Sequence, residues 1–323
     1  MSEKEVLFVS QRPFEQCENL MAVYDEYDHP KVFRQGQNSM ENAELENFAA
    51  VVCDALPLAM IKYKNHCKSI NIGHGIAGGK LYGMDEKFKP WLNVGALAQL
   101  DYVIAPSSGT KQILAQQHNV PIHKVLALGF PRTDWFINYP VKKDPDAVSK
   151  LYVYTPTFRY EKDGYLPKIR WKIIDDLLEN DERLYVKRHY FTKEPLLKGR
   201  KFKRIREADP NSSGDSLLYM ADVLVTDYSS IMFDAYLMGK PVVLFTDDAD
   251  IFLEERGMYL PFPEMYSSRH IHAEGNEEGI VDMLREAYSN GLTQRELDTL
   301  KLVADKCDGN STKRVVKLIE SCL

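Results

Sequence analysis

Short apolar runs alternate along the chain with stretches in which apolar positions recur at helical spacing. "EVLFVS" (5–10) predicts a buried strand, because its apolar residues are continuous and include Val and Phe. Helical spacing follows several such runs, as in "SSGTKQILAQQHN" after Pro106. This alternation predicts parallel sheets with helices on both faces. The other predicted strands are 49–54, 69–73, 101–106, 124–129, 150–158, 183–188, 222–227 and 241–245.

The alternation stops once and then restarts, which predicts two domains. Residues 138–149, "NYPVKKDPDAVS", hold two prolines among mostly polar residues and predict a linker. We therefore expect an α/β protein with two Rossmann-like, doubly wound parallel-sheet domains facing a cleft, at 1–140 and 150–323. Near the end, a Thr293–Glu296 capping box begins one helix. The last helix, from about 310 to 322, is compatible with packing back on the N-terminal domain.

Composition and charge argue against several functional classes. The formal net charge of −6 gives no global signal for nucleic-acid binding. No apolar run approaches the roughly 18 residues that cross a bilayer, and "MSEKEVLFVS" lacks the apolar core of a signal peptide. The five cysteines show no CxxC spacing, which favours reduced thiols in a cytoplasmic protein. The histidine pair in "RHIH" (269–272) is predicted to lie in a loop, so no metal site is expected.

Polar residues fill the turn after one predicted strand. In "ADVLVTDYSSIMFDAYLMGKPVVLF" (221–245), Thr226 to Ser230 connect a strand to a helix. Ser229 or Ser230 is placed to cap that helix, whose free N–H groups and dipole favour an anion. Ordinary capping without a ligand explains the same residues, and the chain contains no GxxxxGK[ST] loop.

Four more predicted strand ends carry residues suited to phosphate binding or proton transfer. Ligands of open α/β sheets bind beyond the carboxyl ends of the strands. Repetition at five strand ends therefore predicts a site for a diphosphate and a base. The four segments are "GHGIAGGK" (73–80) with His74, "GFPRTD" (129–134) with Arg132, "TPTFR" (155–159) with Thr155, Thr157 and Arg159, and "KRHY" (187–190) with His189.

Together these segments resemble the CDP-glycerol glycerophosphotransferases, the family of teichoic-acid primases and polymerases. The resemblance rests on "DVLVTDYSS" with its following helix and "KP", and on "GFPRTD", "YTPTFR", "ERGMY" (255–259) and "DGNSTKR" (308–314). These occur in the family's order from about residue 70 to the end. The family's W-H-G-T-P-x-K is here "GHGIAGGK", and its K-x-H-P is "KRHY". The changed residues lie on the presumed acceptor side.

The resemblance implies a GT-B architecture with the donor nucleotide held mainly by the C-terminal half. It implies transfer of a polyol phosphate, foremost glycerol phosphate, from a CDP-linked donor to a hydroxyl of a lipid-linked or glycan acceptor. It also implies that CMP is released and that the reaction belongs to teichoic-acid or capsule synthesis at the cytoplasmic face of the membrane. No cofactor is expected besides the CDP-polyol donor substrate. Two alternatives stay open: a GT-B glycosyltransferase that uses a nucleotide sugar, and an inactive relic that binds nucleotide.

Residue roles follow from the needs of attack on phosphorus, namely a base, charge neutralisation and a stabilised leaving group. His74 is the expected base, because imidazole titrates near neutrality, and His189 is expected to contact the diphosphate or protonate the leaving phosphate. For both, an ordinary structural or surface histidine is the alternative. The expected donor-phosphate ligands are Arg132, Thr155, Thr157, Arg159, Thr226, Ser229, Ser230, Ser311 and Arg314. The residues expected to orient the turn or contact the polyol are Asp227, Asp234 and Lys80.

The segment "KGRKFKRIRE" (198–207) is strongly basic. One interpretation is a surface for an anionic membrane or a polyanionic acceptor, where each basic residue adds about 1 kcal/mol. The other is a solvated edge strand protected by Lys and Arg. Nucleic acid is not an expected partner, because the chain is acidic overall and carries no nucleic-acid motif.

Overall fold

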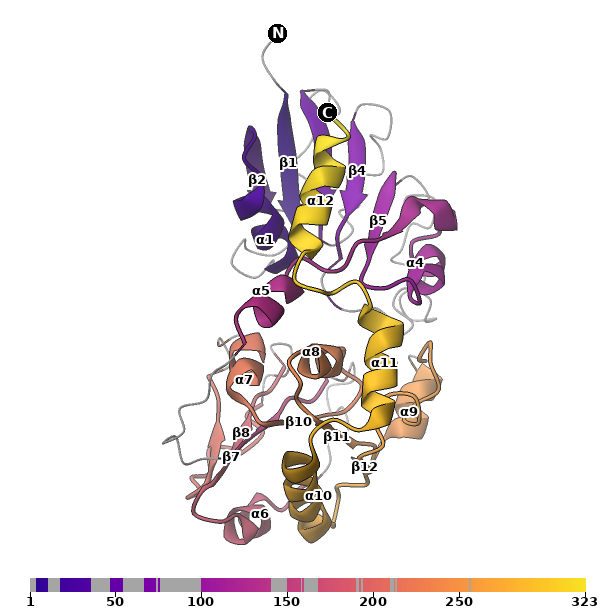
Figure 1. Ribbon diagram of the computed structural model, residues 1–323. Coiled ribbons are helices and arrows are strands. Elements are labelled where there is room, and N and C mark those ends of the chain that lie inside the picture. Colours follow the sequence, from indigo (N-terminus) through magenta and orange to yellow (C-terminus); the bar gives the residue numbers. More distant parts are fainter. Residues whose placement is uncertain are drawn as a thin grey trace. The chain divides into compact units, whose positions relative to one another are not determined.

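The computed structural model divides the chain into two compact units (Figure 1). Unit 1 comprises Met1–Tyr139 and Lys301–Leu323, and unit 2 comprises Pro140–Leu300. The residues whose structure is described are 4–10, 18–35, 47–54, 67–73, 75, 100–140, 150–157, 159, 168–189, 192, 194–209, 212, 214–255 and 257–323.

The described part of unit 1 is built on a six-stranded sheet in the order β2-β1-β3-β4-β5-β6. All of its strand pairs are parallel. The inner strands β1 and β3 are apolar along most of their length, as expected for a sheet covered on both faces. The elements are β1 (Glu5–Ser10), α1 (Glu18–Glu26), β2 (Lys31–Gln35), β3 (Phe48–Cys53), β4 (Lys68–Asn71), β5 (Tyr102–Ala105), α4 (Lys111–Gln117), the 3-10 turn η4 (Ile122–Lys124), β6 (Val125–Ala127), α5 (Thr133–Asn138) and α12 (Ser311–Glu320).

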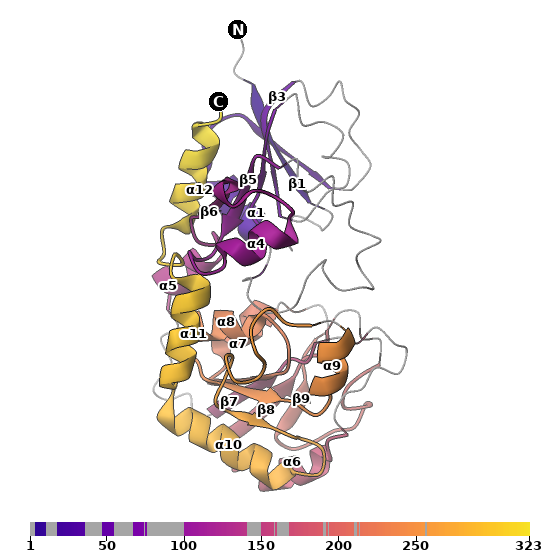
Figure 2. The ribbon, with the colours of Figure 1, turned by 90° about the vertical axis from the view of Figure 1, so that its right-hand side faces the viewer.

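The C-terminal helix α12 belongs to unit 1, where it packs against α1 and α5. Figures 1 and 2 show it along one face of the first sheet. Val315, Val316 and Ile319 form its buried stripe, with the spacing of one helix face. The last helix of the chain therefore completes the core of the first unit.

The second sheet has the strand order β12-β11-β10-β7-β8-β9 and is also parallel throughout the described residues of unit 2. The order places β10 between β11 and β7. The elements are β7 (Lys150–Tyr154), α6 (Trp171–Leu177), β8 (Glu182–Val186), β9 (Ile205–Glu207), α7 (Gly214–Met220), β10 (Val223–Thr226), α8 (Ile231–Leu237), β11 (Val242–Phe245), α9 (Ala249–Glu255), β12 (His270–Ile271), α10 (Glu277–Asn290) and α11 (Gln294–Ala304). The boundary between the units falls within α11.

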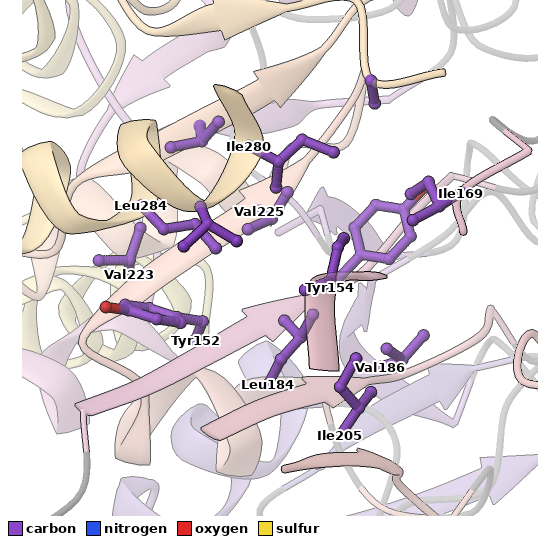
Figure 3. Packing of buried hydrophobic residues seen from close by; sticks show 14 of the residues in the cluster. Tyr152, Tyr154, Ile169, Leu184, Val186, Ile205, Val223, Val225, Ile280 and Leu284 are labelled. Carbon is purple, nitrogen blue, oxygen red and sulfur yellow. The ribbon is translucent and has the colours of Figure 1, made fainter. Parts of the chain in front are cut away.

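The larger core of unit 2 lies between its sheet and helices α6 and α10 (Figure 3). Strand residues such as Tyr152 and Val225 meet Ile280 and Leu284 of α10 there. Figure 2 shows α6 and α10 on the same side of the sheet. Leu217 and Ala221, in and just after α7, pack with Val153 of β7 in a separate cluster. The sheet is therefore covered by helices on both faces, as predicted.

The predicted strands all have counterparts in the structure, and the described residues form three further strands that were not predicted. These are β2, β9 and β12, and each lies at an edge of its sheet. The loop prediction for "RHIH" is wrong, because His270–Ile271 forms β12 and pairs with β11. The capping box is confirmed: Thr293 N–H donates to Glu296 Oε2 at 2.7 Å, and Glu296 N–H donates to Thr293 Oγ1 at 3.3 Å.

The basic segment 198–207 contains the edge strand β9, as one of its two interpretations predicts. Ile205 is buried in the core, whereas Arg204 before it is half-buried and Arg206 after it is exposed. The exposed basic residues of the segment are Lys198, Arg200, Lys201, Lys203 and Arg206. Across the described parts of both units, the helices are too short and too polar to span a membrane.

Candidate functional site

The turns that follow β7 and β10 are joined by hydrogen bonds at the carboxyl edge of the second sheet. Thr226 Oγ1 donates to the Thr155 carbonyl at 2.6 Å. Thr157 N–H donates to the Asp227 carboxylate, at 2.9 Å to Oδ1 and 3.1 Å to Oδ2. Because Thr226 and Asp227 are buried and engaged with backbone, their side chains act first to fix the two turns.

Arg159 extends this joint to the turn after β11. Its Nε donates to Asp248 Oδ2 at 2.7 Å and its Nη2 to Asp248 Oδ1 at 3.0 Å. Its Nη1 donates to Asp227 Oδ2 at 3.1 Å and to the Thr157 carbonyl at 2.7 Å. The three charged side chains are 10%, 3% and 5% exposed for Arg159, Asp227 and Asp248. The predicted phosphate-binding guanidinium is thus directed at carboxylates of the protein.

An aromatic pair supports this ion network. The Tyr228 hydroxyl donates to Asp248 Oδ1 at 2.7 Å, and its ring stacks on Phe252 with centroids 3.8 Å apart. Burial and the Asp248 carboxylate raise the pKa of Tyr228, so the hydroxyl stays protonated. Burial alone would lower the pKa of Arg159, but the two carboxylates outweigh it and raise that pKa. Arg159 therefore keeps its charge, and Tyr228 its proton, near neutral pH.

Sequence reasoning missed Asp248, Tyr228 and Phe252. Asp248 lies three residues beyond the end of β11. The rule that functional residues follow the carboxyl ends of parallel strands could therefore have selected it. Tyr228 lies inside the "TDYSS" turn, but its sequence gave no sign that its hydroxyl faces a carboxylate.

Two serine hydroxyls stand at the start of α8. Ser230 occupies the N-cap position but makes no side-chain capping hydrogen bond. Ile231 N–H donates to Ser229 Oγ at the long distance of 3.5 Å. Both residues are half-buried. The expected capping is therefore weak, and α8 is only seven residues long, so the hydroxyls matter more here than a helix dipole.

Thr155 and the residues after β8 lie along the same sheet edge, because β7 pairs with both β10 and β8. Thr155 Oγ1 is buried and has no hydrogen-bond partner among the residues that the structure describes. A buried polar atom in this state requires an explanation, and a bound ligand is one. Lys187 and His189 are half-buried. Burial lowers the pKa of Lys187, and the Asp209 carboxylate opposes that shift.

The remaining site predictions concern Asp234, Lys80 and metal binding. Asp234 lies in α8 and is buried, with 1% of its surface exposed. Lys80 lies outside the described residues. Among the residues with a described structure, no group of three or more His, Cys, Asp and Glu side chains is placed to hold a metal ion.

In unit 1, the predicted residues follow β4 and β6. His74 lies outside the described residues, and Gly73 directly precedes it. The Phe130 ring packs against Gly73, where a Cβ would lie 3.1 Å from Phe130 Cζ. Arg132 occupies the N-cap position of α5 and is 9% exposed. The "GFPRTD" turn therefore supports the end of β4.

The "GFPRTD" and "DGNSTKR" segments form one joint within unit 1. Asp134 accepts hydrogen bonds from Ser311 N–H at 2.9 Å and Thr312 N–H at 2.7 Å, which caps α12. Arg314 Nε donates to the Leu128 carbonyl at 2.7 Å, and its Nη1 donates to Asp308 Oδ2 at 3.0 Å. Ser311 and Arg314 thus belong to unit 1 and hold α12 in place, whereas the donor site was predicted in the C-terminal half.

Comparisons with known proteins identify the family of the chain. Residues 14–321 match the family described as CDP-Glycerol:Poly(glycerophosphate) glycerophosphotransferase. The teichoic acid glycerol-phosphate primase of Bacillus subtilis (strain 168) is 22% identical over 284 residues, which cover 82% of this chain and 71% of that protein. The teichoic acid ribitol-phosphate primase of Bacillus spizizenii (strain ATCC 23059 / NRRL B-14472 / W23) is 23% identical over 304 residues, 83% of this chain and 73% of that protein.

A solved structure confirms the fold class. The wall teichoic acid polymerase TagF superposes with a TM-score of 0.75 at 18% sequence identity, and the match covers 98% of this chain and 89% of that one. The predicted α/β fold with two GT-B-like parallel-sheet units is therefore confirmed. Because the family match extends over nearly the whole sequence, the chain belongs to the CDP-glycerol:poly(glycerophosphate) glycerophosphotransferase family and is a transferase.

Proposed function

We propose that the chain transfers glycerol phosphate from CDP-glycerol to an acceptor hydroxyl in teichoic-acid synthesis and releases CMP. The observation that carries the site assignment is the group of hydroxyls at adjacent strand ends of unit 2. Ser229 and Ser230 are half-buried, and the Thr155 hydroxyl is buried without a partner among the described residues. Such donors suit the oxygens of a diphosphate, and family membership supports CDP-glycerol as its source.

The reaction breaks one phosphorus–oxygen bond and forms another. The acceptor oxygen attacks the β-phosphorus, and the bond from that phosphorus to the bridging oxygen breaks, so CMP leaves with that oxygen. The proton of the acceptor hydroxyl passes to a base, for which we propose His74. His189 is the proposed donor to the leaving phosphate, since it lies after β8 at the sheet edge that carries Thr155.

The remaining predicted ligands divide by their contacts. Arg159, Asp227 and Thr226 are assigned to positioning, because their polar groups hold the turns after β7, β10 and β11. Thr157 is placed with them, since its backbone N–H binds Asp227. Arg132 remains a proposed phosphate ligand, because a guanidinium can bind phosphate through two parallel hydrogen bonds.

We further propose a lipid-linked acceptor and contact with an anionic membrane at the cytoplasmic face through residues 198–207. Five exposed cations in this segment support the contact. Sedimentation with vesicles tests it. Binding to vesicles that contain phosphatidylglycerol, lost when Lys201 and Lys203 are both changed to Glu, is the expected result. Equal binding by wild type and variant would refute it.

Donor binding is tested by calorimetric titration with CDP-glycerol, CDP-ribitol and UDP-glucose. We expect selective binding of CDP-glycerol and a loss of about tenfold in affinity in Ser229→Ala and Ser230→Ala, the scale of one hydrogen bond to a charged group. The control is Ser268→Ala, because Ser268 is exposed in unit 2 and lies before β12. Preference for UDP-glucose would favour the glycosyltransferase alternative. Equal loss in all three variants would refute the site.

A further inference from the structure

Asn19 is a buried polar residue on α1 whose side chain makes hydrogen bonds to distant parts of unit 1. Its side chain is 1% exposed. Nδ2 donates to the Gly73 carbonyl at 2.9 Å and more weakly to the Ile72 carbonyl at 3.4 Å. Oδ1 accepts the Arg132 backbone N–H at 2.9 Å. One amide group therefore ties the end of β4 to the turn after β6.

Gly73 is fixed by other contacts as well. Its N–H donates to Asn71 Oδ1 at 2.9 Å, so both of its backbone polar groups are bound by asparagine side chains. Its φ of +63° lies in the left-handed region that favours glycine, and a Cβ at this position would lie 3.1 Å from Phe130 Cζ. The Gly73 backbone is thus held by Asn19 and Asn71 and packed against the Phe130 ring.

The pattern of bonds suits positioning better than simple packing. The Asn19 amide binds the carbonyl of Gly73, the residue before the proposed base in the sequence, and the N–H of Arg132, a proposed phosphate ligand. We propose that Asn19 is a positioning residue, which fixes the Gly73 carbonyl and the Arg132 N–H relative to each other and so couples the residue before the proposed base to a proposed phosphate ligand. The expected effect on rate rests on the proposed function, but the structural coupling does not.

Activity gives the first test, with CMP release from CDP-glycerol as the assay. Asn19→Asp keeps an acceptor for the Arg132 N–H but has no donor for the Gly73 carbonyl at neutral pH, whereas Asn19→Leu lacks both. Misplacement of a reacting group by about 1 Å costs on the order of 100-fold in rate. We expect kcat to fall about 30- to 100-fold in both variants. KM for CDP-glycerol is expected to rise less than about fivefold, because Arg132 is a proposed phosphate ligand in unit 1 whereas the proposed hydroxyl ligands Thr155, Ser229 and Ser230 are in unit 2.

The matched control is Asn138→Ala. Asn138 also belongs to unit 1, and its Nδ2 donates to the Gly309 carbonyl at 2.9 Å. This hydrogen bond involves neither Gly73 nor Arg132. Its kcat is expected within about twofold of wild type. An equal loss of kcat in the control, or a rise of KM in place of the loss of kcat, would overturn the positioning role.

Hydrogen exchange gives a second test that needs no turnover. In Asn19→Asp the Gly73 carbonyl loses its donor, while the Arg132 N–H keeps its acceptor. The Gly73 N–H is bound by Asn71, so its exchange reports the local opening that release of the carbonyl permits, and we expect that exchange to be at least about tenfold faster while the Arg132 amide keeps its protection. In Asn19→Leu both amides are expected to exchange faster. Unchanged exchange at both amides would overturn the inference whatever the activity. If wild type releases no CMP, the proposed function fails, and exchange alone decides whether Asn19 couples the two loops. If Asn19→Leu does not fold, Asn19→Asp carries the test.

Discussion

Replacing Asp248 by asparagine removes one of the two carboxylates that pair with Arg159 at the carboxyl edge of the second sheet. The variant keeps the size of the side chain and an oxygen that accepts the Tyr228 hydroxyl. It loses the negative charge and sets an amide NH₂ against a guanidinium that makes two hydrogen bonds to the carboxylate in the wild type. Arg159 is then left in a buried site with Asp227 as its remaining acidic partner among the described residues.

The expected loss follows from burial of the pair. Arg159 and Asp248 are 10% and 5% exposed, and removing one partner of a buried pair costs about 3–5 kcal/mol. We expect about 3 kcal/mol for Asp248→Asn, because Asp227 still neutralises part of the charge. At about 2–4 °C per kcal/mol for a domain of this size, the Tm falls by about 6–12 °C. Combining Asp248→Asn with Arg159→Met is expected to cost about 2 kcal/mol less than the sum of the two single changes.

The assay is urea unfolding followed by the fluorescence of Trp171, which lies in unit 2. Changing Trp91 and Trp135 to Phe in the background leaves Trp171 as the only tryptophan. The control is Asp176→Asn, which breaks an exposed pair with Lys172 and is expected to cost less than about 0.5 kcal/mol. A loss in Asp248→Asn no larger than in the control, or additive costs in the double variant, would refute the coupled network.

Three further predictions concern contacts within one unit or the other. Burial alone would raise the pKa of Glu182, but Arg285 holds it at about 2, below its usual 4.5. The stabilising effect is therefore present above pH 4.5 and lost as pH falls toward 2, so the advantage of wild type over Glu182→Gln in urea unfolding should shrink across that range by about 3 kcal/mol. Gly129→Ala places a Cβ 2.2 Å from two oxygens, at a φ of +83°, and should unfold unit 1 or lower its free energy of unfolding by more than about 3 kcal/mol. The control Gly239→Ala places its Cβ in open space and should lower that of unit 2 by about 1–2 kcal/mol. Circular dichroism on heating checks both. Asp134→Ala removes the acceptor for two N–H groups at the start of α12 and should cost about 1–2 kcal/mol by the same measurement.

The central strands were predictable because they are buried on both faces. A continuous apolar run is then a physical requirement, as in β1 and β3. The strands that were not predicted, β2, β9 and β12, are sheet edges with partly exposed residues. "KVFRQ", "IRE" and "HI" are too short or too polar to be distinguished from loop by their pattern. Their existence depends on the neighbouring strand, which a local pattern does not contain.

The site was partly predictable for a related reason. The rule that ligands bind at strand ends selected Thr155, His189 and the "TDYSS" turn from the sequence. It could not assign the partners of Arg159, since Asp227 and Asp248 lie 68 and 89 residues away along the chain. Nor could it place α12, whose apolar stripe is compatible with either unit until Asp134 is seen to cap it. Long-range pairing therefore decides which of the selected residues face a ligand and which hold the structure.

The most direct test of the account is the product formed from CDP-glycerol. The chain is incubated with CDP-glycerol and a short poly(glycerol phosphate) oligomer or a lipid-linked saccharide, and the products are followed by ³¹P NMR and nucleotide chromatography. The account predicts CMP in equal amount to a new phosphodiester on the acceptor. Release of a nucleoside diphosphate with a new glycosidic bond from UDP-glucose, or no nucleotide release with either acceptor, would contradict it.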